Sequence, residues 1–167
     1  MSKYPRLFSP LNLANHTLAN RIMMPGMGSN LADAQGRVTG KMEAYYRARA
    51  AGKPGTMVVE AAAVHPSGRV IKHHFMAHDQ ESLPGLVRLA AAAKSHGSKA
   101  ILQLIHGGRN AHPTLVGEPL APSPLRGPVA KAVTCPVAAV GRINTAAAAE
   151  EILARVPLVC AGRAFLA

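Results

Sequence analysis

The chain has 167 residues, a length that suggests one domain and suffices to bury a sizeable core. Nearly half of its residues are apolar (49%), which excludes a disordered chain, and no apolar run reaches the roughly 18 residues of a membrane helix. No apolar stretch follows the first residues, so we expect no signal peptide and no membrane partner. With only two cysteines, Cys135 and Cys160, the predicted compartment is a reducing cytoplasm.

The charge balance is strongly basic, with 19 Lys and Arg residues against 8 Asp and Glu and a formal net charge of +11. Such a balance raises nucleic-acid binding as a hypothesis. The basic residues are scattered from Lys3 to Arg163, however, and the aromatic side chains that would stack on bases are scarce. We therefore expect no nucleic-acid partner and favour a phosphate-bearing small ligand, with a solvated basic surface as the other interpretation.

The first part of the chain predicts short strands followed by a helix. Residues 7–18 predict a short extended pair, and residues 21–24 predict a short apolar strand. Residues 39–51 predict a helix that begins at a capping Thr39. One face of this helix is expected to carry Met42, Tyr45, Tyr46 and Ala50.

The remaining chain continues the alternation of strands and helices. The continuous apolar run 56–64 suits a strand that is buried on both faces. Apolar residues then repeat at spacings of three and four over 82–96, which predicts a helix with Gly97 as its C-terminal cap. The segments predicted after it are a strand at 99–105, a Pro- and Gly-rich loop at 112–136, a strand at 137–140, a helix at 146–155, a strand at 157–160 and the beginning of a helix at 162–167.

This order of elements predicts an α/β fold with a mainly parallel sheet of about five strands. A closed (β/α)8 barrel needs eight strands and typically about 250 residues. We therefore expect an open parallel sheet or a partial, shortened (β/α) TIM-type barrel.

Function in folds of this class collects at the carboxyl ends of the strands. Two predicted strands are followed by Gly-Arg pairs, Gly141-Arg142 and Gly162-Arg163. Glycine lets a ligand approach the backbone and arginine offers paired hydrogen bonds to phosphate oxygens, so these positions predict a phosphate site. The alternative is that both arginines simply cover the surface.

A further candidate lies within the strand at 99–105. The amide of Gln103 can both donate and accept hydrogen bonds, which fits the edge of a flavin or of a base, whereas a structural bridge is the other interpretation. The histidines of residues 65–78 lack the spacing and the ligand types of a zinc site, so we expect no metal.

Six short motifs follow one another along residues 4–124. They are Leu7-Phe8-Ser9-Pro10-Leu11, Asn20-Arg21-Ile22-Met23-Met24-Pro25, Tyr45-Tyr46-Arg47-Ala48-Arg49-Ala50, Val59-Glu60, His65-Pro66-Ser67-Gly68-Arg69 and Gln103-Leu104-Ile105-His106-Gly107-Gly108-Arg109. In this order and spacing they resemble the Old Yellow Enzyme family of NAD(P)H:flavin oxidoreductases, in particular its 2,4-dienoyl-CoA reductase-like branch. The last part of the chain resembles the C-terminal end of the same family.

The resemblance implies FMN as cofactor, NAD(P)H as reductant, and an activated alkene or enoyl compound as small-molecule substrate. By position, Pro25, Gly26 and Met27 would border the isoalloxazine ring. Ala61 would offer its backbone to the ring, and Gln103 would bind the pyrimidine edge. The phosphate would be held by Gly141, Arg142, Gly162 and Arg163.

The resemblance also divides the chain. Residues 1–124 would form N-terminal βα units of a flavin-binding barrel, residues 125–136 a Pro-rich junction, and residues 137–167 the C-terminal phosphate-binding βα units. In the family, a long central stretch joins the two parts and supplies further strands, a His-x-x-Asn or His-x-x-His pair that holds the substrate carbonyl, and a Tyr proton donor. The short junction replaces all of this, so we expect ene-reduction to be impaired or lost, and no catalytic residue is assigned.

A shortened barrel also leaves a sheet edge unpaired. An exposed edge is a template for another strand, so two copies could complete one another as a homo-oligomer. The alternative to an FMN-binding oxidoreductase is therefore a non-catalytic fragment that acts by strand pairing with itself or with a full-length relative.

Overall fold

A computed structural model of the chain describes residues 3–117, the strands at 138–140 and 158–160, and positions 147 and 150. The helices and strands are, in order, β1 (Leu11–Leu13), β2 (His16–Leu18), β3 (Ile22–Met24), α1 (Gly40–Ala50), β4 (Thr56–Ala63), α2 (Leu83–Lys94), β5 (Lys99–Ile105), α3 (Pro113–Val116), β6 (Ala138–Val140) and β7 (Leu158–Cys160). Single turns of 3-10 helix in the connections are η1 (Pro66–Gly68), η2 (Gln80–Ser82) and η3 (Gly108–Asn110).

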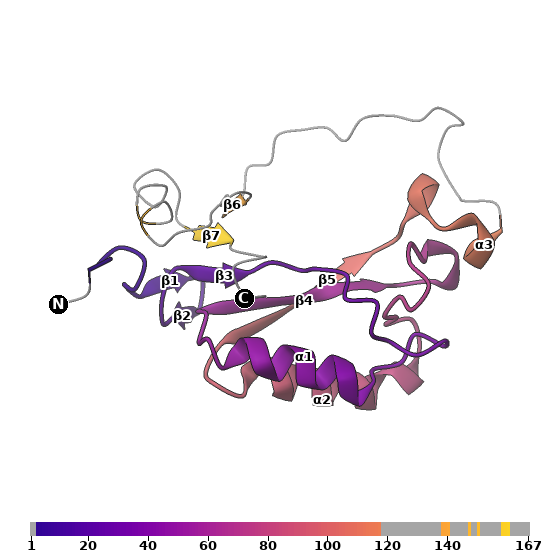
Figure 1. Cartoon of the computed structure of the whole chain (residues 1–167), viewed down its shortest axis with the longest axis horizontal. Helices are drawn as coiled ribbons and strands as arrows, with labels where there is room; N and C mark the ends of the chain where they lie inside the picture. Colours follow the sequence, from indigo (N-terminus) through magenta and orange to yellow (C-terminus); the bar gives the residue numbers. More distant parts are fainter. Residues whose placement is uncertain (1–2, 118–137, 141–146, 148–149, 151–157, 161–167) are drawn as a thin grey trace.

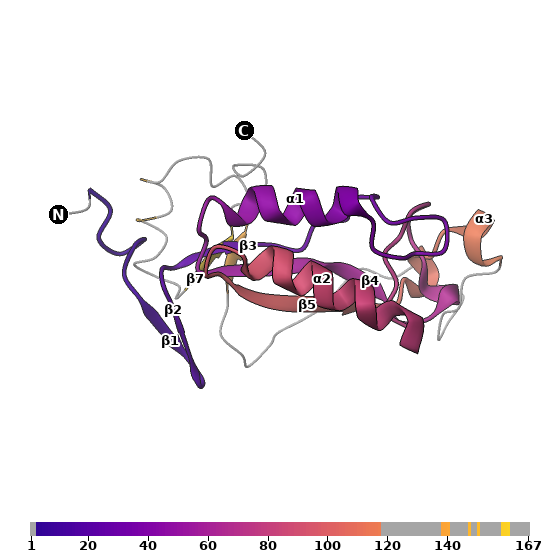
Figure 2. The ribbon, with the colours of Figure 1, turned by 90° about the horizontal axis from the view of Figure 1, so that it is seen from below.

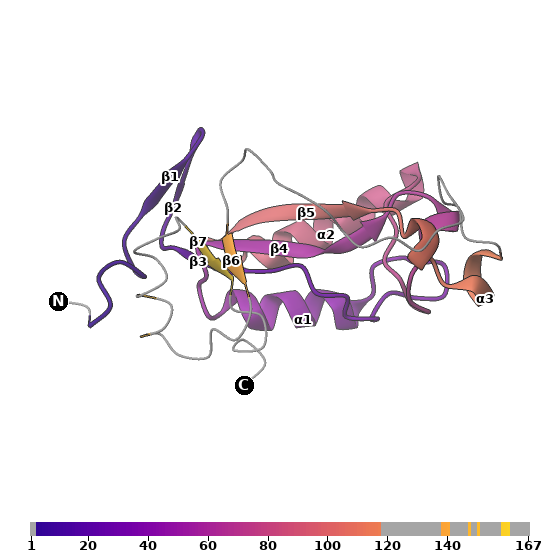
Figure 3. The ribbon, with the colours of Figure 1, turned by 90° about the horizontal axis from the view of Figure 1, so that it is seen from above.

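Five of the strands form one parallel sheet. Their order across the sheet is β5-β4-β3-β7-β6, and each adjacent pair runs parallel (Figure 3). The predicted parallel sheet is confirmed, and its strands all end at the same edge. The extended pair predicted at 7–18 is the antiparallel hairpin of β1 and β2, which lies near the amino end of β3 (Figure 1).

The two long helices cover one face of this sheet, side by side (Figure 2). Both were predicted, and their buried residues recur at helical spacing. In α1 the buried side chains are Met42, Tyr46 and Ala50, and in α2 they include Leu89, Ala92 and Ala93. These side chains join Met24, Met57 and Val59 of the strands in one apolar core. Tyr45, predicted on the same face, is half-buried and packs against the edge of this core.

The predicted beginning of α1 at a capping Thr39 is confirmed, whereas α2 ends two residues earlier than predicted, at Lys94, and its cap is Ser95 rather than Gly97. The Thr39 hydroxyl accepts a hydrogen bond from the Met42 N–H at 3.2 Å and donates one to the Leu31 carbonyl at 2.6 Å. Gly97 follows α2 with a φ of +92°, a conformation that glycine adopts without a steric penalty.

Some expectations lie outside the described residues. They are the Pro-rich junction at 125–136 and the beginning of a helix at 162–167, together with the helix at 146–155 except for its positions 147 and 150, which are helical. The short helix α3 was not predicted, because four residues carry no apolar period. Within the described part of the chain, neither long helix has the length and hydropathy that crossing a bilayer requires.

Candidate functional site

The connections that follow β3, β4 and β5 meet at the carboxyl edge of the sheet. The Gly107 N–H donates to the Gly68 carbonyl at 2.9 Å, and the Met76 N–H donates to the Gly36 carbonyl at 2.9 Å. These bonds join the connections to one another, so the edge is one continuous surface rather than three separate loops.

A salt bridge fastens the outer part of this edge. The guanidinium of Arg37 binds both carboxylate oxygens of Asp79, with 2.7 Å between Nη2 and Oδ2, and also contacts Glu81 at 2.8 Å. The hydrogen bonds from Arg37 hold the pKa of Asp79 well below its usual range. The connection after β3 is therefore tied to η2 by a charged pair that stays ionised.

Gly26 and Gln103 lie against one another, although they belong to different βα units. A Cβ atom on Gly26 would overlap Oε1 of Gln103 and would lie 3.3 Å from Cγ1 of Val58. Gln103 is itself exposed, and its amide has no hydrogen-bond partner among the residues that the structure describes. The amide of Gln103 therefore occupies space that a side chain at position 26 would fill. Its polar atoms remain available to a ligand.

The side chain of Gln103 projects from the sheet face opposite the helices. In β5 it alternates with Ala100 and Leu102, which line a groove against α2. Val58 alternates in the same way with Met57 and Val59, two members of the core. The face that carries Gln103 is the one that would form the inside of a barrel.

A β-bulge interrupts β4 near its carboxyl end. The register of β4 against β5 shifts between Val59 and Ala62, so Glu60 and Ala61 stand outside the regular ladder. The Ala61 carbonyl accepts a hydrogen bond from Nε2 of His74 at 2.8 Å. Such bulges re-aim backbone and side chains next to functional sites.

Glu60 is the most unusual residue of the bulge. It is 1% exposed, and its Oε2 accepts a hydrogen bond from the Ser29 N–H at 2.7 Å. Its own N–H donates to the Tyr46 hydroxyl oxygen at 2.7 Å. Its Oε1 is buried without a partner among the described residues, and burial raises the pKa of the carboxyl group. Burial, followed by the nearby charge of Glu60, also raises the pKa of Tyr46.

Two histidines at this edge make hydrogen bonds that connect the loops. Ser67 Oγ lies 2.8 Å from Nδ1 of His65 and 3.0 Å from Nε2 of His106, which joins η1 to the end of β5. In the described residues, no three His, Cys, Asp or Glu side chains gather into a group that could hold a metal ion.

The structure therefore brings together five of the nine predicted site residues. Pro25, Gly26 and Met27 form the connection directly after β3, Ala61 lies in the bulge of β4, and Gln103 lies on β5. The other four, Gly141, Arg142, Gly162 and Arg163, lie outside the described residues. In the sequence they follow β6 and β7, two strands that run parallel to β3.

Sequence reasoning missed the hydrogen bonds that shape this edge. It named Glu60 within a family motif but gave it no role, and it placed Tyr46 only on a core face and in a motif. The one available signal was a single carboxylate inside the otherwise apolar run 56–64. His74 carried no signal, because its partners are backbone groups.

At this edge the structure offers an exposed amide, that of Gln103, beside Val58 and a Gly26 that has no side chain. Such an arrangement fits a flat heterocycle with a polar edge, and Gly26 is the position at which a side chain would fill the space of that amide. On this observation, the residues present fit the ring of a flavin.

Comparison with known proteins agrees with this arrangement. A family model described as the NADH:flavin oxidoreductase / NADH oxidase family matches residues 6–129. NADH:fumarate oxidoreductase of Klebsiella pneumoniae is 39% identical over 131 residues, which are 77% of this chain and 14% of that protein. NADPH dehydrogenase of Bacillus subtilis is 37% identical over 119 residues, which are 71% of this chain and 35% of that protein.

Solved structures show the same fold. The Old Yellow Enzyme homologue from Zymomonas mobilis matches with a TM-score of 0.68 at 26% sequence identity, over 75% of this chain and 35% of that one. The chain thus spans between 14% and 35% of the length of these proteins. The predicted fold is confirmed: the described strands and helices form part of a (β/α) TIM-type barrel.

Proposed function

The chain belongs to the NADH:flavin oxidoreductase / NADH oxidase family, and on this basis we propose that it binds FMN at the carboxyl edge of its sheet, with NAD(P)H as reductant. When bound, FMN supplies hydride transfer from NAD(P)H to an activated C=C bond. The proposed substrates are small activated alkenes or enoyl compounds.

The approach of Gly26 to Gln103 is the observation that supports the proposal most directly. The connection at Pro25, Gly26 and Met27 would border the ring, and the open amide of Gln103 would bind the pyrimidine edge. The half-buried Ala61 would face the ring with its backbone, which the bond from His74 holds in place. The phosphate would bind to the residues that follow β6 and β7, namely Gly141, Arg142, Gly162 and Arg163.

Reduction of the substrate is proposed to be impaired. Between β5 and β6 the chain has only the 32 residues 106–137, which include α3. A group that polarises the substrate carbonyl contributes strongly to the rate of such reactions, and this short connection offers no His-x-x-Asn or His-x-x-His pair. Flavin binding and flavin turnover are therefore separate expectations.

The phosphate of FMN gives a direct test, because riboflavin lacks it. The double variant Arg142→Ala, Arg163→Ala is expected to lower the affinity for FMN about tenfold or more, since two charge-assisted contacts to the phosphate are lost. Its affinity for riboflavin should equal that of the wild type. Quenching of flavin fluorescence on titration measures both affinities.

A matched control removes the same charge elsewhere. Arg47 and Lys94 are exposed residues of the two long helices, and the variant Arg47→Ala, Lys94→Ala should bind FMN as the wild type does. Equal losses in the two double variants would mean that only net charge matters. A wild-type protein that quenches neither flavin would contradict the proposal.

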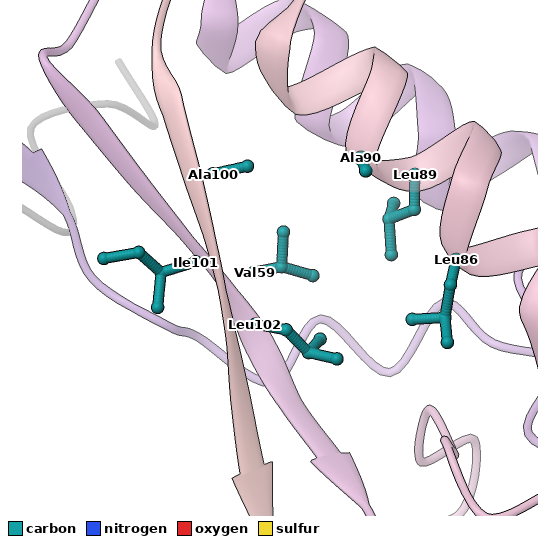
Figure 4. A pocket seen from close by; sticks show the side chains of 7 residues that line it. All are labelled: Val59, Leu86, Leu89, Ala90, Ala100, Ile101 and Leu102. Carbon is teal, nitrogen blue, oxygen red and sulfur yellow. The ribbon is translucent and has the colours of Figure 1, made fainter. Parts of the chain in front are cut away.

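Strand pairing is the second candidate function, and the exposed edge of the sheet favours it. In the described sheet β5 is an outermost strand, and its Leu104 is 60% exposed. A groove of about 240 Å³ lies between β5 and α2 (Figure 4), lined by Val59, Leu86, Leu89, Ala90, Ala100, Ile101 and Leu102. Association with itself or with a full-length relative in the absence of flavin would favour this candidate over the first.

A further inference from the structure

We propose that Glu60 is a positioning residue for the flavin ring, because its side chain ties the connection after β3 to the bulge of β4. The inference rests on the proposed function, since it concerns the surface on which the ring would lie. It assigns a task to a buried acid that neither the sequence analysis nor the proposed function uses.

The contacts of Glu60 join the two backbone segments expected beside the ring. Its Oε2 accepts the Ser29 N–H at 2.7 Å, and Ser29 lies two residues beyond Met27. In the other direction Glu60 is the direct neighbour of Ala61 within the bulge. One side chain therefore sets the spacing between the Pro25–Met27 connection and Ala61.

Two further hydrogen bonds hold the backbone of Glu60 and of its neighbour Ala61. The Tyr46 hydroxyl of α1 accepts the Glu60 N–H, and Nε2 of His74 donates to the Ala61 carbonyl. Both contacts hold the bulge without involving the carboxyl group. These two bonds fix the backbone on either side of the Glu60 side chain. The carboxyl group in turn holds the backbone of Ser29 in place.

The unfavourable burial of the Glu60 carboxyl group also indicates a functional role for this residue. Glu60 is 1% exposed and its Oε1 has no partner among the described residues, and burying a carboxyl group that is only partly hydrogen-bonded is unfavourable. An apolar residue would fill the same space at a lower cost. Local violations of this kind are expected at functional sites.

Two variants separate positioning from folding. Glu60→Gln keeps an acceptor for the Ser29 N–H, whereas Glu60→Met keeps the volume and removes the acceptor. We expect Glu60→Met to weaken FMN binding about tenfold and Glu60→Gln to bind within about threefold of the wild type. Without flavin, amide hydrogen exchange at Ser29 should be about tenfold faster in Glu60→Met than in the other two proteins.

The thermal midpoint of unfolding distinguishes a positioning role from a merely structural one. A structural role would lower the midpoint together with the FMN affinity. Because Glu60→Met removes the unpartnered buried oxygen, it should unfold at or above the wild-type temperature while binding FMN more weakly. Thr56→Val is the matched control. Thr56 is 1% exposed at the other end of β4 and its hydroxyl has no partner among the described residues, so FMN affinity should not change.

Unchanged FMN affinity in a folded Glu60→Met protein, or a loss of affinity that only follows a loss of thermal midpoint, would overturn the inference and leave the proposed function standing. A wild-type protein that binds no FMN would overturn the proposed function and with it this role. Should Glu60→Met fail to fold, Ser29→Pro removes the same donor and carries the same expectation.

Discussion

Single residues at the carboxyl edge are held in defined protonation states by their hydrogen bonds. Nδ1 of His74 accepts the Val70 N–H at 3.0 Å, so the ring proton must lie on Nε2, which donates to the Ala61 carbonyl. A second ring proton would meet the N–H of Val70. The geometry therefore selects the neutral imidazole, in agreement with burial, which lowers the pKa of His74.

Stability should depend on pH through this histidine. The pKa of His74 lies below its ordinary value of 6.5, so the unfolded chain binds the proton first as the pH falls. The stabilisation is thus complete above pH 6.5 and is lost as the pH falls from there toward the folded-state pKa. We expect the unfolding free energy of the wild type to fall more steeply from about pH 7.5 to about pH 5.5 than that of His74→Gln, as measured by urea unfolding. Equal slopes would contradict this assignment.

The residues of the site differ in how far the sequence could predict them. Gly26 was named by its position in the family resemblance and Gln103 first by the chemistry of its amide, and the structure places the two residues against one another. Glu60 and His74 act through backbone partners that are distant in sequence, namely Ser29 and Ala61. Such contacts depend on the packing of loops, and no local pattern encodes them.

Helices and strands could be predicted where the spacing of apolar residues agrees with the residues that typically begin or end such elements. The run 56–64 gave β4, and the spacing of Met42, Tyr46 and Ala50 gave the buried face of α1. The bulge in β4 could not be predicted, since a register shift depends on the neighbouring strand and not on the strand alone. It is this bulge that sets Glu60 and Ala61 apart from the ladder.

The N-terminal end of α1 offers a test at the scale of the element. The Thr39 hydroxyl both accepts the Met42 N–H and donates to the Leu31 carbonyl, so it fixes the helix to the preceding connection. Thr39→Val removes both bonds at constant shape and should lower the free energy of unfolding by about 1–2 kcal/mol. Thr39→Ser keeps both bonds and should cost less than about 0.5 kcal/mol. Chemical denaturation compares the two, and equal costs would show that the methyl group matters rather than the hydroxyl.

The described part of the molecule is a segment of a barrel whose sheet ends at an outermost strand. Among the described strands, β7 joins the sheet beside β3 and β6 lies beyond it, while β5 is outermost on the other side (Figure 3). A closed barrel leaves no such edge. Here the described edge strand exposes apolar side chains, among them Ile101 at 45% and Leu104 at 60%. The net charge of +11 acts against association of two copies, so the two effects compete.

The oligomeric state in solution shows whether the exposed edge strand or the net charge dominates. If the edge dominates, light scattering after size-exclusion chromatography should give a mass above that of the 17.4 kDa monomer. Leu104→Lys places a charge on the edge strand and should return the protein to the monomer, because an edge lysine must be desolvated when another strand pairs. Phe8→Lys adds the same charge at a residue 50% exposed and outside the sheet, so it should associate as the wild type does. A monomeric wild type would show strand pairing between copies to be wrong, and equal effects of the two lysines would assign association to net charge instead of the edge.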